Sequence, residues 1–170
     1  MRNMDKRKFE PLAYFKELAE KNRLCRSYNF VPVFGSGPEN IEGIMQEFRN
    51  AENFIIIEDC TDNNVHNSRP GWFTKTVYTV WVIAATDFDD AEMRKERMAL
   101  CRNIFRQFLS RMIRDKAGMV YGQDMYYLAL DRVYYKELGR YSFNGATGLY
   151  FMVDNDVPTG LVYNQEEWEE

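Results

Sequence analysis

The chain has 170 residues, of which 45% are apolar and 28% are charged. This length and composition predict one folded domain with a sizeable core and exclude extensive disorder. The 22 basic and 26 acidic residues give a net charge of −4, which argues against a protein that coats nucleic acid. No run of 18 apolar residues occurs and the N-terminus is charged, so we expect neither a membrane span nor a secretion signal.

The N-terminal part of the chain is predicted to be mainly helical. Apolar residues at helical spacing within residues 9–24, with Pro11 in the first turn, predict a first helix. Residues 28–34 favour a short edge strand or an extended connector, because Pro32 cannot donate a hydrogen bond to a sheet. Residues 35–50 open with a glycine-rich turn and continue with an apolar stripe, so a second, short helix is expected there.

The middle of the chain predicts a β-hairpin with a long polar tip. The run FIIIEDC at 54–60 has the β-branched composition and the length of a buried strand. Residues 72–86, rich in Val, Thr, Tyr and Trp, predict a long second strand. The polar run 61–71 between them has almost no apolar anchor except Val65, so we expect a mobile loop that becomes ordered on a partner.

A long helix is predicted from Asp87 to about Lys116. Asp87 is placed to cap it, and acidic residues in the first turns and basic residues in the last match the helix dipole. We expect Phe105 and Phe108 to be buried between this helix and the sheet. They belong to an apolar stripe that also contains Met98, Cys101, Leu109 and Met112.

The last part of the chain predicts a second hairpin. Residues 125–143 read as a strand in which Gly139 could hold a bulge, Asn144-Gly145 is a tight-turn signal, and residues 149–153 form the returning strand. Residues 154–170 contain six acidic residues and no basic one.

The predicted fold class is α+β. We expect a mainly antiparallel sheet of two β-hairpins, with the long helix packed on one face and the helices gathered on that face. Residues 1–170 are predicted to form a single domain. Residues 1–52 would be a helical N-terminal extension packed on it, and residues 154–170 an acidic C-terminal tail.

No catalytic, cofactor or metal site is predicted. His66 is the only histidine, and it lies in the polar run without a convergent set of ligands. The glycine-rich turn at 35–39 is interpreted as an ordinary helix entry, because no P-loop lysine follows it. Cys25, Cys60 and Cys101 are odd in number and far apart, which fits a reducing cytoplasm, and Cys60 and Cys101 are expected to be buried.

Charge is distributed unevenly along the chain. Between Arg94 and Lys116, eight basic and two acidic residues give a net charge of +6 and leave −10 for the rest. Opposite patches of this kind suit head-to-tail association. Lys95, Arg102 and Arg106 would project from one flank of the long helix as candidate subunit contacts, the simpler alternative being a solvated outer face.

The order of elements from residue 53 onward carries a resemblance to a known family. A hairpin, FIIIEDC to TKTVYTVWVIAA, precedes a helix that begins after an Asp-rich turn, TDFDDAEMRKERMALCRNIFRQFL, and a closing hairpin follows, DRVYYKELGRYSFNGATGLYFMVD. This pattern resembles the small phage tail-terminator and tail-completion proteins, also called minor tail or head–tail joining proteins. The resemblance covers residues 53–153, and the N-terminal helical part and the acidic tail are additional to it.

The resemblance implies a non-enzymatic structural protein of a phage or prophage tail. Such a protein forms a ring, commonly a hexamer, that terminates the tail tube and joins it to the head connector. Its partners would be copies of itself, the tail-tube protein and the head connector protein, without a cofactor or a membrane, and with nucleic acid at most passing through the pore.

The resemblance also implies assembly in the bacterial cytoplasm and a final place in the virion. The polar run 61–71 becomes a candidate contact with the tail tube, through Asp62, Asn63, Asn64, His66 and Arg69. The alternative function is a small cytoplasmic protein-interaction or adaptor domain without catalysis.

Overall fold

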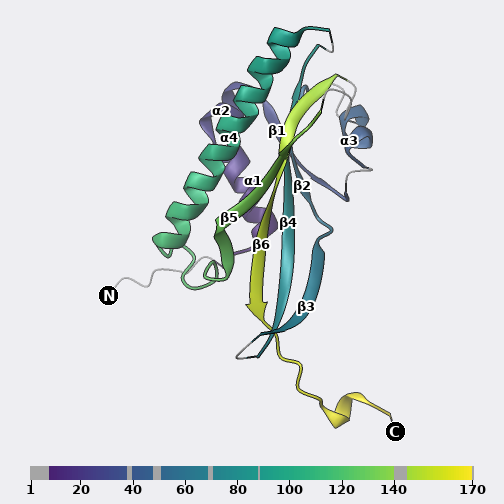
Figure 1. The fold of residues 1–170 in the computed structure, drawn as a ribbon, viewed down its shortest axis with the longest axis vertical. Coiled ribbons are helices and arrows are strands. Elements are labelled where there is room, and N and C mark those ends of the chain that lie inside the picture. Colours follow the sequence, from purple (N-terminus) through teal and green to yellow (C-terminus); the bar gives the residue numbers. More distant parts are fainter. Residues whose placement is uncertain are drawn as a thin grey trace.

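One six-stranded sheet carries the fold (Figure 1). The computed structural model describes residues 8–37, 40–47, 51–68, 71–87, 89–139 and 145–169. The strands are β1 Phe30–Gly35, β2 Asn53–Glu58, β3 Asp62–Ser68, β4 Gly71–Ala85, β5 Leu128–Glu137 and β6 Ala146–Pro158. Their order is β1-β2-β4-β6-β5, with β3 paired to β4, and only the β1–β2 pair is parallel. The predicted α+β class, with a mainly antiparallel sheet, is confirmed.

Helices lie against both faces of the sheet (Figure 1). The helices α1 Pro11–Lys21 and α4 Ala91–Ala117 cover one face together with the short α2 Arg23–Ser27. The short α3 Ile41–Glu47 packs on the other face, so the expectation that all helices share one face is wrong. The reason is that β2 is apolar on both sides, as strands with two covered faces are.

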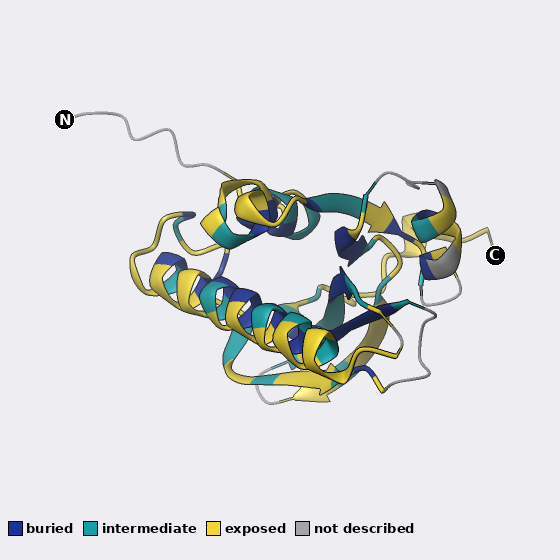
Figure 2. Cartoon of the chain, turned by 90° about the horizontal axis from the view of Figure 1, so that it is seen from above, coloured by how far each residue is buried: buried dark blue, intermediate teal, exposed yellow. Residues whose placement is uncertain are grey.

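The main core lies between α1, α4 and the sheet. Phe105 and Phe108 of α4 are buried as predicted, with ring centroids 5.0 Å and 6.5 Å from that of Phe151 on β6. Phe15 of α1 reaches the same ring from the other helix, at 6.4 Å. Figure 2 shows the buried stripe of α4 turned toward this layer and its outer face exposed.

A smaller core lies under α3. Ile41 and Ile44 of this helix pack with Phe54, Ile56 and Trp81 of the sheet. The helix can approach the sheet closely because residue 35 at the end of β1 is a glycine. A Cβ there would lie 2.8 Å from Cδ1 of Ile44 and 2.9 Å from Cγ2 of Ile56.

Residues 62–68 of the predicted polar loop form a strand, and residues 69 and 70 lie outside the described residues. Asp62–Ser68 forms β3, which pairs antiparallel with residues 71–77 of β4. Residues 58–61 lie opposite only residues 78 and 79, so a bulge separates β2 and β3 along one hairpin arm. The loop prediction was wrong because β4 continues past the end of β2 and supplies backbone hydrogen-bond partners to a segment with no apolar face.

The long helix begins slightly later than predicted. Asp90 and not Asp87 is its N-cap, and its side chain accepts a hydrogen bond from the backbone N–H of Met93 at 2.9 Å. Asp87 instead accepts one from the backbone N–H of Asp89, also at 2.9 Å. The predicted C-terminal end is confirmed to within one residue.

The second hairpin differs from its prediction in detail. Residues 130–133 of β5 lie opposite the single Val153, so the bulge is there and not at Gly139. Residues 140–144, which include Asn144 of the predicted turn, lie outside the described residues. Strand β6 extends to Pro158, and the first residues of the predicted tail therefore belong to the sheet.

Candidate functional site

The predicted cationic flank of α4 is partly neutralised inside the chain. Lys95 and Arg102 line an open hollow of about 400 Å³ whose opposite wall includes Glu137, at the end of β5. Arg102 donates from Nε to Oε1 of Glu137 at 2.5 Å and from Nη2 to Oε2 at 2.8 Å. Arg106, one turn further along α4, donates to Oδ1 of Asn103 at 2.9 Å and 3.2 Å.

The Arg102–Glu137 pair is a bidentate surface ion pair. Its hydrogen bonds lower the pKa of the Glu137 carboxyl and raise the pKa of the Arg102 guanidinium. Because the charge of Arg102 is matched by Glu137, Lys95 and Arg106 carry most of the uncompensated charge among the three predicted subunit contacts.

The predicted tube-contact residues lie on the exposed strand β3. Successive side chains of a strand point to opposite faces. One face of β3 therefore carries Asp62, Asn64 and His66, and the other carries Asn63. Arg69 lies outside the described residues. The predicted tube-contact residues on β3 therefore lie on two faces of a strand, whereas the sequence predicted that they share one loop.

Two polar side-chain contacts hold the exposed end of the sheet together. Nε2 of His66 lies 2.9 Å from Oδ1 of Asp156, and Nζ of Lys75 lies 2.5 Å from Oδ2 of Asp154. The ring of His66 also stacks on Phe73, with centroids 5.8 Å apart. These contacts link β3 and β4 to β6, which gives His66 a role within the sheet.

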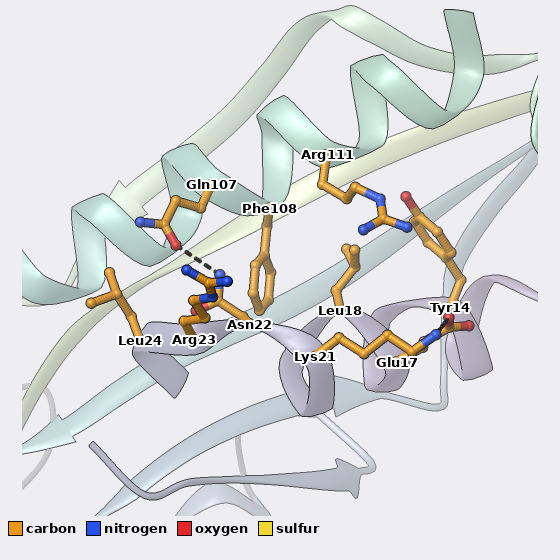
Figure 3. A pocket seen from close by; sticks show the side chains of 10 residues that line it. All are labelled: Tyr14, Glu17, Leu18, Lys21, Asn22, Arg23, Leu24, Gln107, Phe108 and Arg111. Carbon is orange, nitrogen blue, oxygen red and sulfur yellow. Dashed lines mark hydrogen bonds and ion pairs between the residues drawn. The ribbon is translucent and has the colours of Figure 1, made fainter. Parts of the chain in front are cut away.

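A groove runs between α4 and the α1–α2 pair (Figure 3). It has a volume of about 370 Å³, and its apolar lining comes from Leu18, Leu24 and Phe108. Asn22 donates from Nδ2 to Oε1 of Gln107 at 2.8 Å, which ties α2 to α4 across the groove. Its charged lining residues are Glu17, Lys21, Arg23 and Arg111.

Sequence reasoning missed a buried carboxylate at one end of this groove. Asp115 of α4 is only 1% exposed, and it accepts hydrogen bonds from Oη of Tyr14 at 3.0 Å and from Nε of Arg111 at 2.8 Å. Burial, and then the hydrogen bond to Asp115, raise the pKa of Tyr14. Arg111 and Asp115 are four residues apart, so the sequence indicates that they can pair on one helix face. Nothing in the sequence shows that α1 covers this pair.

The C-terminal segment, residues 159–169, extends away from the sheet (Figure 1). Its base is held by Thr159, whose backbone N–H donates to the carbonyl of Trp72 at 2.9 Å. A single 3-10 turn, Gln165–Glu167, interrupts it. Four large apolar side chains on it are exposed, Leu161, Val162, Tyr163 and Trp168, with Val162 at 89%.

The three cysteines have different environments. Cys25 and Cys101 are buried, and burial raises the pKa of both thiols to about 12, so they are protonated at neutral pH. Cys60 is exposed at the bulge between β2 and β3, and the prediction that it is buried was wrong. The strand prediction ran through residue 60, whereas β2 ends at Glu58.

The described residues form neither a metal-binding cluster nor a membrane-spanning helix. No group of three or more His, Cys, Asp or Glu side chains there is arranged to hold a metal ion. Within the same ranges, every helix is too short or too polar to cross a bilayer.

The chain matches no protein-family model and no curated protein sequence. The functional proposal therefore depends on the element order and on the surfaces described above.

Proposed function

We propose that the protein is a non-enzymatic structural protein of a phage or prophage tail, which forms a ring that terminates the tail tube and joins it to the head connector. The order of elements supports this proposal. A hairpin made by β2, β3 and β4, the long helix α4 and the β5–β6 hairpin follow one another as in the pattern that resembles tail-terminator proteins.

The exposed C-terminal segment is the observation that carries the proposal. Leu161, Val162, Tyr163 and Trp168 are clustered in a short stretch and remain in contact with solvent. Clustered exposed apolar side chains on a soluble domain mark contact sites for other proteins. We infer that the C-terminal segment is a contact site for another protein subunit.

Charge supports a head-to-tail arrangement of subunits. The Arg94–Lys116 stretch of α4 is strongly basic, and the rest of the chain carries the compensating acidic excess. Contacts between two different surfaces close into a ring when the rotation between neighbours is right. The proposed partners are copies of the chain, the tail-tube protein and the head connector protein, with nucleic acid at most passing through the pore.

The assembly state is tested first. We expect light scattering and negative-stain microscopy of the purified chain to show a closed ring of one fixed stoichiometry. Reversing the charge of Lys95 and Arg106 together should slow ring formation more than it destabilises finished rings, because exposed charges act chiefly on association rate. A monomer or a two-fold dimer at every concentration would favour the adaptor domain instead.

The tail function needs a second experiment. The proteins encoded beside this chain include, on this proposal, a tail-tube protein that polymerises in vitro. Adding the ring should shorten the tubes and leave a ring at one end of each, as measured by electron microscopy. An equal amount of an unrelated acidic protein is the control, and an unchanged length distribution would contradict the proposal.

A further inference from the structure

The C-terminal segment and the groove between α4 and the α1–α2 pair have complementary chemistry. The segment combines exposed apolar side chains with Glu166, Glu167 and Glu169 and has no basic residue. The groove combines an apolar lining with three cations and one carboxylate. We propose that the C-terminal segment of one copy docks into this groove of a second copy. The inference rests on the proposed function, because it names the contact that links neighbouring subunits of the ring.

The groove suits side chains of the segment in size and polarity. Its volume of about 370 Å³ lies in the range of small ligand sites and can hold a large aromatic ring such as that of Trp168. Phe108 and Leu18 are buried beneath it and Leu24 is half-buried at its edge, so the surface offered to an incoming ring is apolar.

The charges of the groove match those of the segment. Lys21 and Arg23 stand on the α1–α2 side and Arg111 on the α4 side (Figure 3). Lys21 is paired with Glu17, and Arg111 with Asp115. Arg23 is exposed at the start of α2. It is therefore the cation that we assign to the carboxylates of Glu166 and Glu167.

The direction of the segment favours a second copy over its own groove. The hydroxyls of Thr74 and Thr159 lie 2.5 Å apart, and the backbone N–H of Thr159 is bound to Trp72, so the segment is anchored at the end of β6. From there it runs away from α1, α2 and α4 (Figure 1). A contact between one copy's segment and the next copy's groove joins two different surfaces, which is the geometry of a ring.

A peptide-binding experiment tests the contact itself. The probe is a fluorescein-labelled peptide of residues 159–169. The receptor is the full chain with three substitutions in its own segment, Leu161→Ser, Val162→Ser and Trp168→Ser. They weaken competition between that segment and the peptide for the groove. We expect saturable binding by fluorescence anisotropy. Adding Arg23→Glu to the receptor should weaken binding about tenfold or more, because the change replaces an attractive charge with one that repels the carboxylates of the peptide.

Charge exchange and a matched control sharpen this test. A peptide with Glu166→Lys and Glu167→Lys should recover affinity for the Arg23→Glu receptor. The control Arg132→Glu removes an exposed cation on β5, outside the groove, and should leave binding unchanged. Absent binding, or equal binding to the Arg23→Glu receptor, would overturn the inference.

Measuring the oligomer mass of variants tests the docking contact separately from the proposed ring. The parent chain and Ile113→Ser, an exposed apolar control on α4, should form rings, while the triple segment variant should be monomeric by light scattering. Rings formed equally well by the triple variant would overturn the docking contact and leave the ring intact. Two-fold dimers that the triple variant abolishes would support the docking contact and contradict the ring. A monomeric parent chain would overturn both.

Discussion

The two halves of β4 lie in opposite environments although they belong to one strand. Residues 80–84 are almost completely buried, with helices over both faces, whereas residues 72–79 are partly or fully exposed. Both halves have antiparallel neighbours on both sides, β2 or β3 on one and β6 on the other. The backbone pairing is therefore the same, and the difference comes from the cover that α1, α3 and α4 provide.

This difference divides one sheet into a covered end and an exposed end. Burial of apolar side chains is the main source of folding free energy, so the covered end should determine the stability of the chain. The exposed end, with β3 and the C-terminal segment, contributes little to the core and keeps its side chains in contact with solvent.

The largest expected effect is in the core of the covered end. Phe108→Ala removes a fully buried ring between α4 and Phe151, and should lower the free energy of unfolding by about 3–5 kcal/mol. Urea denaturation followed by circular dichroism measures it. Val65→Ala on β3 is the control at the exposed end and should change stability by less than about 0.5 kcal/mol. Equal losses of unfolding free energy for the two variants would show that the covered and exposed ends contribute equally to stability.

A smaller effect is expected where α1 meets α4. Tyr14→Phe deletes the hydroxyl that donates to buried Asp115, and should cost about 1.5–3 kcal/mol, as hydrogen bonds to charged groups do. Arg111 still binds the carboxylate, which limits the loss. The same substitution at exposed Tyr126 is the control, and thermal unfolding of the two variants gives the comparison. A loss no larger than that of Tyr126→Phe would show that Asp115 does not depend on Tyr14.

The Arg102–Glu137 pair should give a weak, pH-dependent contribution. The folded-state pKa of Glu137 is lowered from 4.5 by Arg102, so its stabilisation is present above the unfolded pKa and is lost as pH falls through the folded value. Glu137→Gln should cost up to about 1 kcal/mol at about pH 7, because the pair is solvent-exposed. In urea denaturation the difference in stability between the parent and the variant should shrink as the pH is lowered through the folded-state pKa of Glu137. Glu166→Gln in the C-terminal segment should have no effect at either pH.

The smallest effect on stability is expected at the C-terminal segment. Removing residues 160–170 takes away exposed described residues and leaves Thr159 in place, so the unfolding free energy should change by less than about 0.5 kcal/mol. Denaturation of the shortened chain measures this, and oligomer mass of the same sample should fall. A clear loss of stability would show that the segment packs on its own chain.

Elements with a strong local pattern were predictable from the sequence. The stripe that contains Phe105 and Phe108 and the charge bias at the ends of α4 depend on neighbours along one helix, so the helix and its buried face were predicted correctly. Strand β2 was predicted for the same reason, because β-branched residues follow one another at 55–57. The N-cap of α4 was not predicted correctly. Several acidic residues precede the helix, and the pattern alone does not show that Asp90 and not Asp87 is the cap.

Features set by distant parts of the chain were not predictable. Strand β3 has polar side chains on both faces and a single apolar one, Val65, and it is a strand because β4 is long enough to pair with it. The position of α3 on the second face follows from the close approach at Gly35, and the burial of Asp115 follows from the position of α1. The groove and its relation to the C-terminal segment also require the packed helices, so no local pattern indicated them.

The bulge in β5 has a consequence for how the protein behaves at high concentration. An edge strand with regular, unpaired backbone groups recruits strands of other molecules and leads to fibrous aggregates, but residues 130–133 interrupt the ladder of β5. The opposite edge, β1, contains Pro32, which lacks a backbone donor, and the free edge of β3 carries polar side chains on both faces. The sheet is thus protected against growth at its margins. At high protein concentration, association through the backbone of the sheet edges is therefore disfavoured, and contacts between side-chain surfaces are the remaining way for copies to associate.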